Sequence, residues 1–193
     1  MTGAGGAHAG AIADVRLRLA TDGDWGMIRR WLAEPAVIRW WGPKATTEAE
    51  VMLAMGSSAA LSRIIEVDRK PIGYAHALDA ALLGEDLPGG VEVGTWDIDL
   101  FVASAEYRGR GVGARALELI RDEVFETTLA PAVSIFVSVG NERAVRAYEK
   151  AGFRWRTVVQ GVRSGAGTGS GTGAVRDPEW LMTAERPSAR RLL

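Results

Sequence analysis

The stretch EYRGRGVGARALELI, residues 106–120, sets three glycines and two arginines at the start of an apolar, helix-forming segment. It follows TWDIDLFVA, residues 95–103, which has the composition of a β-strand. Backbone N–H groups that converge at a helix N-terminus bind phosphate, and glycine lets the backbone approach such a group closely. The stretch lacks the lysine of a P-loop and the spacing of a dinucleotide fingerprint. By itself it fits a phosphate-binding cradle and a flexible basic turn equally well.

The composition limits the classes of function that the chain can have. It has 193 residues, 47% of them hydrophobic, and a formal net charge of -1. We therefore expect one globular domain without the basic surface of a nucleic-acid-binding protein. The chain has no cysteine and two histidines, which excludes disulfides, a thiolate nucleophile and a histidine-rich metal centre, and no metal site is expected. No apolar run reaches membrane-spanning length and residues 1–14 lack the features of a signal peptide, so a cytoplasmic protein is expected.

The pattern of apolar residues and turn signals predicts a mixed α/β order of strands and helices. Strands are expected at residues 15–19, 62–67, 72–80, 95–103, 132–139, 153–159 and 178–185, and helices at 24–33, 47–61, 113–126 and 141–151. The segment IRWWGPK, residues 38–44, is expected to be a loop. We expect a single domain over residues 15–185 that includes a flexible glycine-rich loop at 163–173, with tails at 1–14 and 186–193.

Two motifs in this order resemble those of the GCN5-related N-acetyltransferases (GNAT). Arg108-Gly109-Arg110-Gly111-Val112-Gly113 resembles the Arg/Gln-x-x-Gly-x-Gly/Ala signature, which lies between a strand and a helix. Residues 141–153, NERAVRAYEKAGF, resemble the Asn-x-x-Ala-x-x-x-Tyr-x-x-x-Gly-Phe segment that follows the next strand. The resemblance spans residues 15–185. It implies a central, mostly antiparallel mixed sheet of six to seven strands with about four flanking helices.

The resemblance also implies acetyl-coenzyme A as the cofactor. The residues matched to its pyrophosphate site are Arg108, Gly109, Arg110, Gly111, Val112, Gly113 and Ala114. The residues Leu100, Phe101 and Val102 would pair with the pantetheine arm, as an added strand does. Asn141 and Arg146 would contact the coenzyme from the next helix, and Tyr148 would protonate the departing thiolate. No covalent enzyme intermediate is needed, which agrees with the lack of cysteine.

Acidic residues in the strand before the glycine loop indicate the acceptor. Asp97 and Asp99 are two positions apart, so in a strand they lie on the same face. Two carboxylates side by side fit a solvated strand edge or a pair neutralised by an arginine, and as a functional site they predict an anionic pocket for a polyamine-like substrate. One member of such a pair has a raised pKa, which suits a general base for the attacking amine.

Several segments resemble the bacterial aminoglycoside 6'-N-acetyltransferases, among them VIRWWG at 37–42 and IDLF at 98–101. By that resemblance Asp99 is the general base at the 6'-amine, and Trp40 and Trp41 line the pocket. Glu85 and Asp86 would lie in an acidic substrate flap, and Asp97 would add to the negative charge. The expected substrate is an aminoglycoside, a small polycationic amine, and acetylation would confer antibiotic resistance. A monomer or a homodimer is expected.

The resemblance is incomplete at one substrate contact. An aspartate expected at the end of the strand before Asn141 is absent, because that strand ends in Ser138-Val139-Gly140. Asp177 and Glu179 could replace the lost charge, but exposed loop acids are the preferred interpretation of these two residues.

Two other functions stay open at this point. An acyltransferase for siderophore-type hydroxylamines ranks second, because its histidine is expected beside the strand position of Asp99, whereas His76 lies on a different strand and is expected to be half-buried. A coenzyme-A-binding protein without catalysis ranks third, since Asn141, Tyr148 and Asp99 are all present.

Overall fold

The structure is a computed structural model that describes residues 14–83, 91–159 and 178–187. The expected acidic flap residues Glu85 and Asp86, the glycine-rich loop at 163–173 and Asp177 lie outside the described residues, as does most of each expected tail. Arg186, the first residue of the expected C-terminal tail, donates hydrogen bonds to the carbonyls of Phe125, Thr128 and Ala130.

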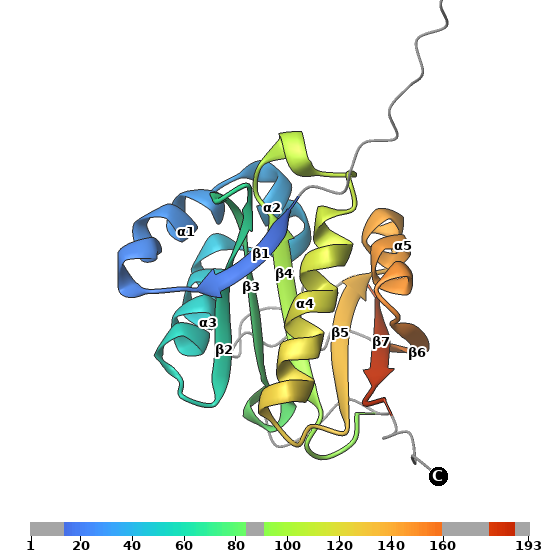
Figure 1. The fold of residues 1–193 in the computed structure, drawn as a ribbon. Coiled ribbons are helices and arrows are strands. Elements are labelled where there is room, and N and C mark those ends of the chain that lie inside the picture. The colour runs from blue at the N-terminus through green and yellow to red at the C-terminus, as the bar shows by residue number, and fades with distance from the viewer. Residues whose placement is uncertain (1–13, 84–90, 160–177, 188–193) are drawn as a thin grey trace, which may run out of the picture.

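A seven-stranded mixed sheet forms the centre of the molecule (Figure 1), in the order β1-β2-β3-β4-β5-β7-β6. All neighbouring strands are antiparallel except β4 and β5, which are parallel. The strands are β1 (Val15–Leu19), β2 (Ala60–Val67), β3 (Lys70–Asp79), β4 (Trp96–Val102), β5 (Ala132–Ser138), β6 (Arg154–Val159) and β7 (Glu179–Glu185). The expected fold class is confirmed, and the sheet has the upper number of strands expected.

Helices cover both faces of the sheet. The long helix α4 (Val112–Thr127) and the short helix α5 (Glu142–Lys150) pack on one face, where alternate strand residues such as Ile98 and Leu100 meet Leu117, Ile120 and Tyr148. The other face carries α1 (Trp25–Trp31), α2 (Pro35–Trp41) and α3 (Lys44–Gly56), whose apolar residues pack on Ile64, Tyr74 and Phe101. No helix in the described part of the chain is long and apolar enough to cross a membrane.

The helix α2 corrects the expectation that residues 38–44 form a loop. Pro35 stands in the first turn of this helix, where its missing N–H and fixed φ favour a helix start instead of preventing one. The helix ends at Gly42, whose φ of 91° stops it. The sequence therefore encodes five α-helices in the described residues instead of about four. α3 also begins and ends earlier than expected, because Pro43 is its N-cap and the chain enters β2 at Ala60.

The strands β4 and β5 are paired over a very short distance. Their ladder joins only Trp96 to Val133 and Asp97 to Ser134. Beyond these pairs the two strands separate, although β4 continues to Val102 and β5 to Ser138. A parallel sheet that opens in this way leaves backbone edges without a partner strand, so a ligand can enter between them.

Gly73 is required where β3 passes β4. A Cβ atom at this position would lie 2.2 Å from the carbonyl oxygen of Phe101, which is a backbone atom and cannot rotate away. We expect Gly73→Ala to lower the free energy of unfolding by about 2–3 kcal/mol, the cost of overpacking a closely packed interior. The measurement is urea denaturation followed by tryptophan fluorescence.

Gly56→Ala is the matched control for this prediction. A Cβ atom at Gly56 meets nothing within 4 Å, so this variant should unfold at a urea concentration equal to or above that of the wild-type protein. A Gly73→Ala protein that is as stable as Gly56→Ala would contradict the close β3–β4 contact.

Candidate active site

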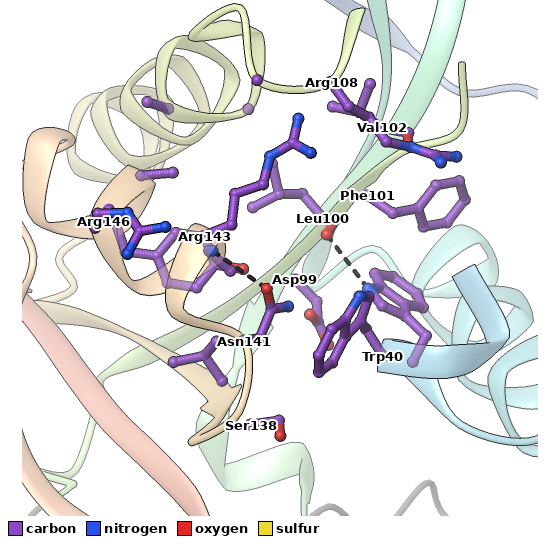
Figure 2. A pocket seen from close by; sticks show the side chains of 18 of the residues that line it. Trp40, Asp99, Leu100, Phe101, Val102, Arg108, Ser138, Asn141, Arg143 and Arg146 are labelled. Atoms are coloured by element: carbon purple, nitrogen blue, oxygen red, sulfur yellow. Dashed lines mark hydrogen bonds between the residues drawn. The ribbon is translucent and has the colours of Figure 1, made fainter. Parts of the chain in front are cut away.

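A pocket of about 590 Å³ lies where β4 and β5 separate. Its walls come from α2, β4, the glycine loop before α4, the end of β5, α5 and the start of β7. Figure 2 shows Asp99 and Trp40 together with Asn141, Arg143 and Arg146 of α5 around this space. The expected site residues that line it are Trp40, Trp41, Asp99, Leu100, Phe101, Val102, Arg108, Gly109, Gly111, Gly113, Ala114, Asn141, Arg146 and Tyr148.

Three of the described residues expected at the site do not line the pocket. Val112 is buried in the core with an exposed fraction of 1%, because the first turn of α4 directs it toward the sheet. Arg110 is exposed beside the loop, and Asp97 is buried elsewhere. Val112 can therefore contribute only its backbone to a ligand at this helix end.

The glycine loop has the backbone shape of an anion cradle. Gly109 and Gly111 have φ of 78° and 83°, which side-chain-bearing residues rarely adopt, and Gly111 is the N-cap of α4. A Cβ atom at Gly111 would meet nothing within 4 Å, so the backbone there faces open space. With the N-terminal amides of a helix behind it, the loop fits a phosphate or pyrophosphate group.

The arginine that faces the cradle is not the one that the sequence singled out. Arg108 donates from Nε to the carbonyl of Val102 at 2.8 Å and also bonds Ala103, so its side chain fastens the loop to the end of β4. Arg143 instead reaches the loop, with Nη2 lying 2.7 Å from where a Cβ atom of Gly109 would be. The spacing of Arg143 and Arg146 on one helix face could have indicated this role.

The adjacent tryptophans of α2 have different positions at the pocket. Trp41 is half-buried and donates from Nε1 to the carbonyl of Leu100 at 3.3 Å, while its ring meets that of Phe101 edge-on at 4.8 Å. Trp40 is 36% exposed, with the guanidinium of Arg39 4.7 Å from its ring centre. Trp41 therefore closes the pocket on the β4 side, and Trp40 offers an open aromatic face at its mouth.

The two aspartates of β4 share a face, as their spacing predicted, and both are buried, with exposed fractions of 7% for Asp97 and 4% for Asp99. Only Asp99 lines the pocket. Asp97 sits at the last position where β4 is paired with β5, and it accepts a hydrogen bond from Ser134 Oγ at 2.9 Å. The expectation that both carboxylates form one substrate pocket is therefore not met by the geometry.

A buried histidine lies beside Asp99. His76 of β3 is directly opposite Asp99 in the β3–β4 ladder, and its exposed fraction is 1%. His76 lies on a different strand from Asp99, as expected, but it is fully buried instead of half-buried, and antiparallel pairing sets it beside Asp99. Glu50 of α3 completes the group, with its Oε1 4.0 Å from His76 Nε2.

One atom from each of these three side chains lies within 4.8 Å of the others.

Tyr148 and Asn141 approach from the opposite face of the sheet. Asn141 is the N-cap of α5, accepting from the backbone N–H of Ala144 at 3.3 Å, and it also lines the pocket. Tyr148 is buried with an exposed fraction of 9%. Burial raises the pKa of its hydroxyl above the usual value, and the nearby Asp97 carboxylate acts in the same direction. The hydroxyl therefore stays protonated at neutral pH and is able to donate.

Glu179 lies at the place where a substrate-contacting acid is missing from the sequence. It is the first residue of β7 and pairs with Ser138, the last residue of β5. It is half-buried and lines the pocket, so the expectation of an exposed loop acid was wrong. Since paired residues share a face, Ser138 and Glu179 lie on the same side of the sheet as Asp99.

Comparisons with known proteins agree with this architecture. A family model described as an acetyltransferase (GNAT) domain matches residues 20–160. The aminoglycoside N(6')-acetyltransferase type 1 of Klebsiella pneumoniae is 29% identical over 147 residues, which are 72% of this chain and 73% of that protein. The crystal structure of the aminoglycoside acetyltransferase AAC(6')-Ib with coenzyme A is similar, with a TM-score of 0.72, 25% identity and coverage of 90% of this chain and 95% of that one.

A more distant structure shares the fold alone. The spermidine N-acetyltransferase of Vibrio cholerae, solved with CoA and spermine, has a TM-score of 0.65 and 16% identity, over 89% of this chain and 95% of that one.

The burial of Tyr148 predicts that the folded protein loses stability at alkaline pH. Because the folded state keeps a proton that the unfolded chain gives up, the free energy of unfolding should fall as the pH rises above about 10, the ordinary tyrosine pKa. Tyr148→Phe removes this group and should make the decline shallower. Urea denaturation at a series of alkaline pH values measures the effect.

Tyr74→Phe should flatten the same curve, since burial also raises the pKa of Tyr74. An identical pH dependence for the wild-type protein and for Tyr148→Phe would show that the Tyr148 hydroxyl is not held neutral by the fold.

Proposed function

This chain belongs to the GNAT acetyltransferase family and is an acetyl-CoA-dependent N-acetyltransferase, and we propose that within this activity it acetylates the 6'-amine of aminoglycoside antibiotics and thereby confers resistance. The observation that carries the proposal is the buried carboxylate of Asp99, which lines the pocket at the gap between β4 and β5. An ammonium group is the natural partner of such a carboxylate.

The coenzyme would lie in the gap between the two strands. The amides at the start of α4, around Gly109, Gly111 and Gly113, would hold its pyrophosphate, and Arg143 and Arg146 would add charge-assisted bonds. When bound, acetyl-CoA supplies an acetyl thioester that an amine can attack directly. The β4 backbone from Leu100 to Val102 has no β5 partner, although Trp41 and Arg108 already bond two of its carbonyls.

The acid and the base would act from opposite faces of the sheet. Asp99 would accept the proton of the attacking amine from the face that carries α1 to α3. Tyr148, on the face that carries α4 and α5, would donate its proton to the sulfur. Proton transfers of this kind typically contribute rate factors of about 10²–10⁴ each. The gap between β4 and β5 is what lets groups on the two faces reach one reacting centre.

The acceptor side of the pocket suits a polycationic sugar. Trp40 presents an exposed aromatic face on which a sugar ring can stack, and Asp99 and Glu179 are two negative charges on one side of the sheet. Aminoglycosides are bound by AAC(6')-Ib in similar structures, one with kanamycin and one with ribostamycin. In this proposal, Glu179 takes the place of the aspartate that is missing before Asn141, and Glu85 and Asp86 add a long-range attraction for the polycation.

One observation favours a second acceptor class. A histidine beside the base is expected of acyltransferases for siderophore-type hydroxylamines, and His76 lies opposite Asp99 in the sheet. The alternative substrate is therefore a hydroxylamino-lysine group, and it belongs in the same assay.

The substrate test is release of free thiol from acetyl-CoA with aminoglycosides that have or lack a 6'-amine. Turnover is expected only when the 6'-amine is present, and expression in a susceptible bacterium should raise the inhibitory concentration of the same drugs. Asp99→Asn should lower kcat by about 10²-fold or more, the usual cost of a lost general base.

Asp22→Asn, which changes an exposed aspartate in the turn before α1, should leave kcat unchanged. Turnover of a hydroxylamino-lysine or a polyamine, with no turnover of any 6'-amino drug, would refute the aminoglycoside assignment while leaving the acetyltransferase activity in place.

A separate prediction tests the role of Glu179. Glu179→Gln should raise KM for the aminoglycoside about tenfold, equivalent to about 1.4 kcal/mol, and leave KM for acetyl-CoA unchanged. The exposed Glu185 at the other end of β7 provides the matched control, and Glu185→Gln should change neither constant. Equal KM values for Glu179→Gln and Glu185→Gln would show that Glu179 does not contact the substrate.

A further inference from the structure

We propose that Asp99, His76 and Glu50 form a proton relay that carries the proton of the attacking amine out of the pocket, with His76 and Glu50 acting as positioning residues behind Asp99. This inference rests on the proposed function, because it assumes that Asp99 is the base. It gives a role to His76, which is buried, and to Glu50, which is partly buried. Neither residue lines the pocket.

The three side chains belong to three elements that converge on one face of the sheet. His76 on β3 and Asp99 on β4 are cross-strand partners, and α3 places Glu50 over them. One oxygen of each carboxylate and one imidazole nitrogen all lie within 4.8 Å of one another. A hydrogen bond needs a separation of about 2.7–3.2 Å, and in this proposal small side-chain rotations bring the atoms that close during turnover.

Aromatic rings enclose the histidine and keep water away from it. The ring of Trp41 meets the His76 ring edge-on at 5.9 Å, and the Tyr74 ring lies 5.7 Å away. In this enclosed space a carboxylate on either side of an imidazole stabilises the imidazolium form, as in the Ser-His-Asp arrangement of hydrolases. The order of the relay would be Asp99 at the substrate, His76 in the middle and Glu50 at the end.

The reaction releases one proton in each turnover. A substrate ammonium loses two protons when it becomes an amide. Its nitrogen forms the bond to the acetyl carbon, the carbon–sulfur bond breaks, and the sulfur keeps that electron pair and takes one proton from Tyr148. One amine proton replaces the proton that Tyr148 gave to the sulfur. The other must leave the protein.

Glu50 provides the connection to solvent. The exposed fractions of Asp99 and His76 are 4% and 1%, whereas the Glu50 side chain is 14% exposed. The proton accepted by Asp99 would pass to His76, the imidazolium would be stabilised by Glu50, and the proton would leave from the Glu50 side to water. Asp99 then returns to its carboxylate form for the next turnover.

Other titratable groups around the relay have separate partners. Asp97 on β4 accepts from Ser134, Tyr74 on β3 donates to Ser62, and Glu48 on α3 pairs with Arg29 and Lys44. A change in the pH dependence of kcat on mutation of His76 or Glu50 can therefore be assigned to the relay.

The test is a double-mutant cycle with His76→Gln and Glu50→Gln. Each variant should lower kcat by about tenfold or more while KM for the amine and for acetyl-CoA changes less than about twofold. The double variant should be no slower than the slower single variant, because groups that act as one unit are not additive. The acidic limb of the kcat profile should also move in both single variants relative to the wild-type protein.

Tyr74→Phe is the matched control, because it keeps the ring against His76 and removes only the hydroxyl bonded to Ser62. Its kcat should equal that of the wild-type protein. Thermal unfolding of every variant verifies that the fold is retained. Unchanged kcat in His76→Gln, additive effects in the double variant, or wild-type turnover that is lost on chelation and restored by Zn²⁺ would each overturn the relay.

The amine used in this cycle is whichever one the wild-type protein acetylates. If that amine is a polyamine or a hydroxylamine instead of an aminoglycoside, the proposed substrate is wrong and the relay is still tested. If the wild-type protein acetylates no amine, the relay falls together with the proposed function.

Discussion

The brief pairing of β4 with β5 is the constraint on which the rest of this molecule depends. Two residue pairs hold the parallel strands together, and beyond them the sheet opens. The opening frees backbone edges, and the pocket that fills it is lined by residues from both faces of the sheet and from the loop before α4. A continuous ladder would have buried these groups and left Asp99 and Tyr148 on separate surfaces.

The chemistry of the site then follows from what lies on each face. The α4 and α5 side combines a positive cradle with a tyrosine that burial keeps protonated. The α1 to α3 side combines buried acids with aromatic rings, and each of these acids has a polar neighbour, as a buried charge requires. Ser134 donates a hydrogen bond to Asp97, and His76 and Glu50 lie close to Asp99.

Much of the fold was predictable because its signals are local. The glycines before α4, the Asn141 cap and the alternation in β4 place the coenzyme half of the site, and these are properties of consecutive residues. The expected loop at residues 38–44 was wrong for an equally local reason, because Pro35 begins a helix that continues to Trp41. The rest of the site was less predictable, because strand pairing between distant segments brings Glu179 and His76 there, and the packing of α5 brings Arg143 to the glycine loop.

The sequence alone therefore determined the family and the coenzyme, since these follow from motifs with fixed spacing, and by resemblance it proposed Asp99 as the base and Tyr148 as the acid. Only the tertiary structure decided which charges share a space. It removed Asp97 from the pocket, placed Glu179 in it, and set His76 beside Asp99. The physical reason is that cross-strand register and helix packing join residues tens of positions apart, and no periodicity within one segment reports such contacts.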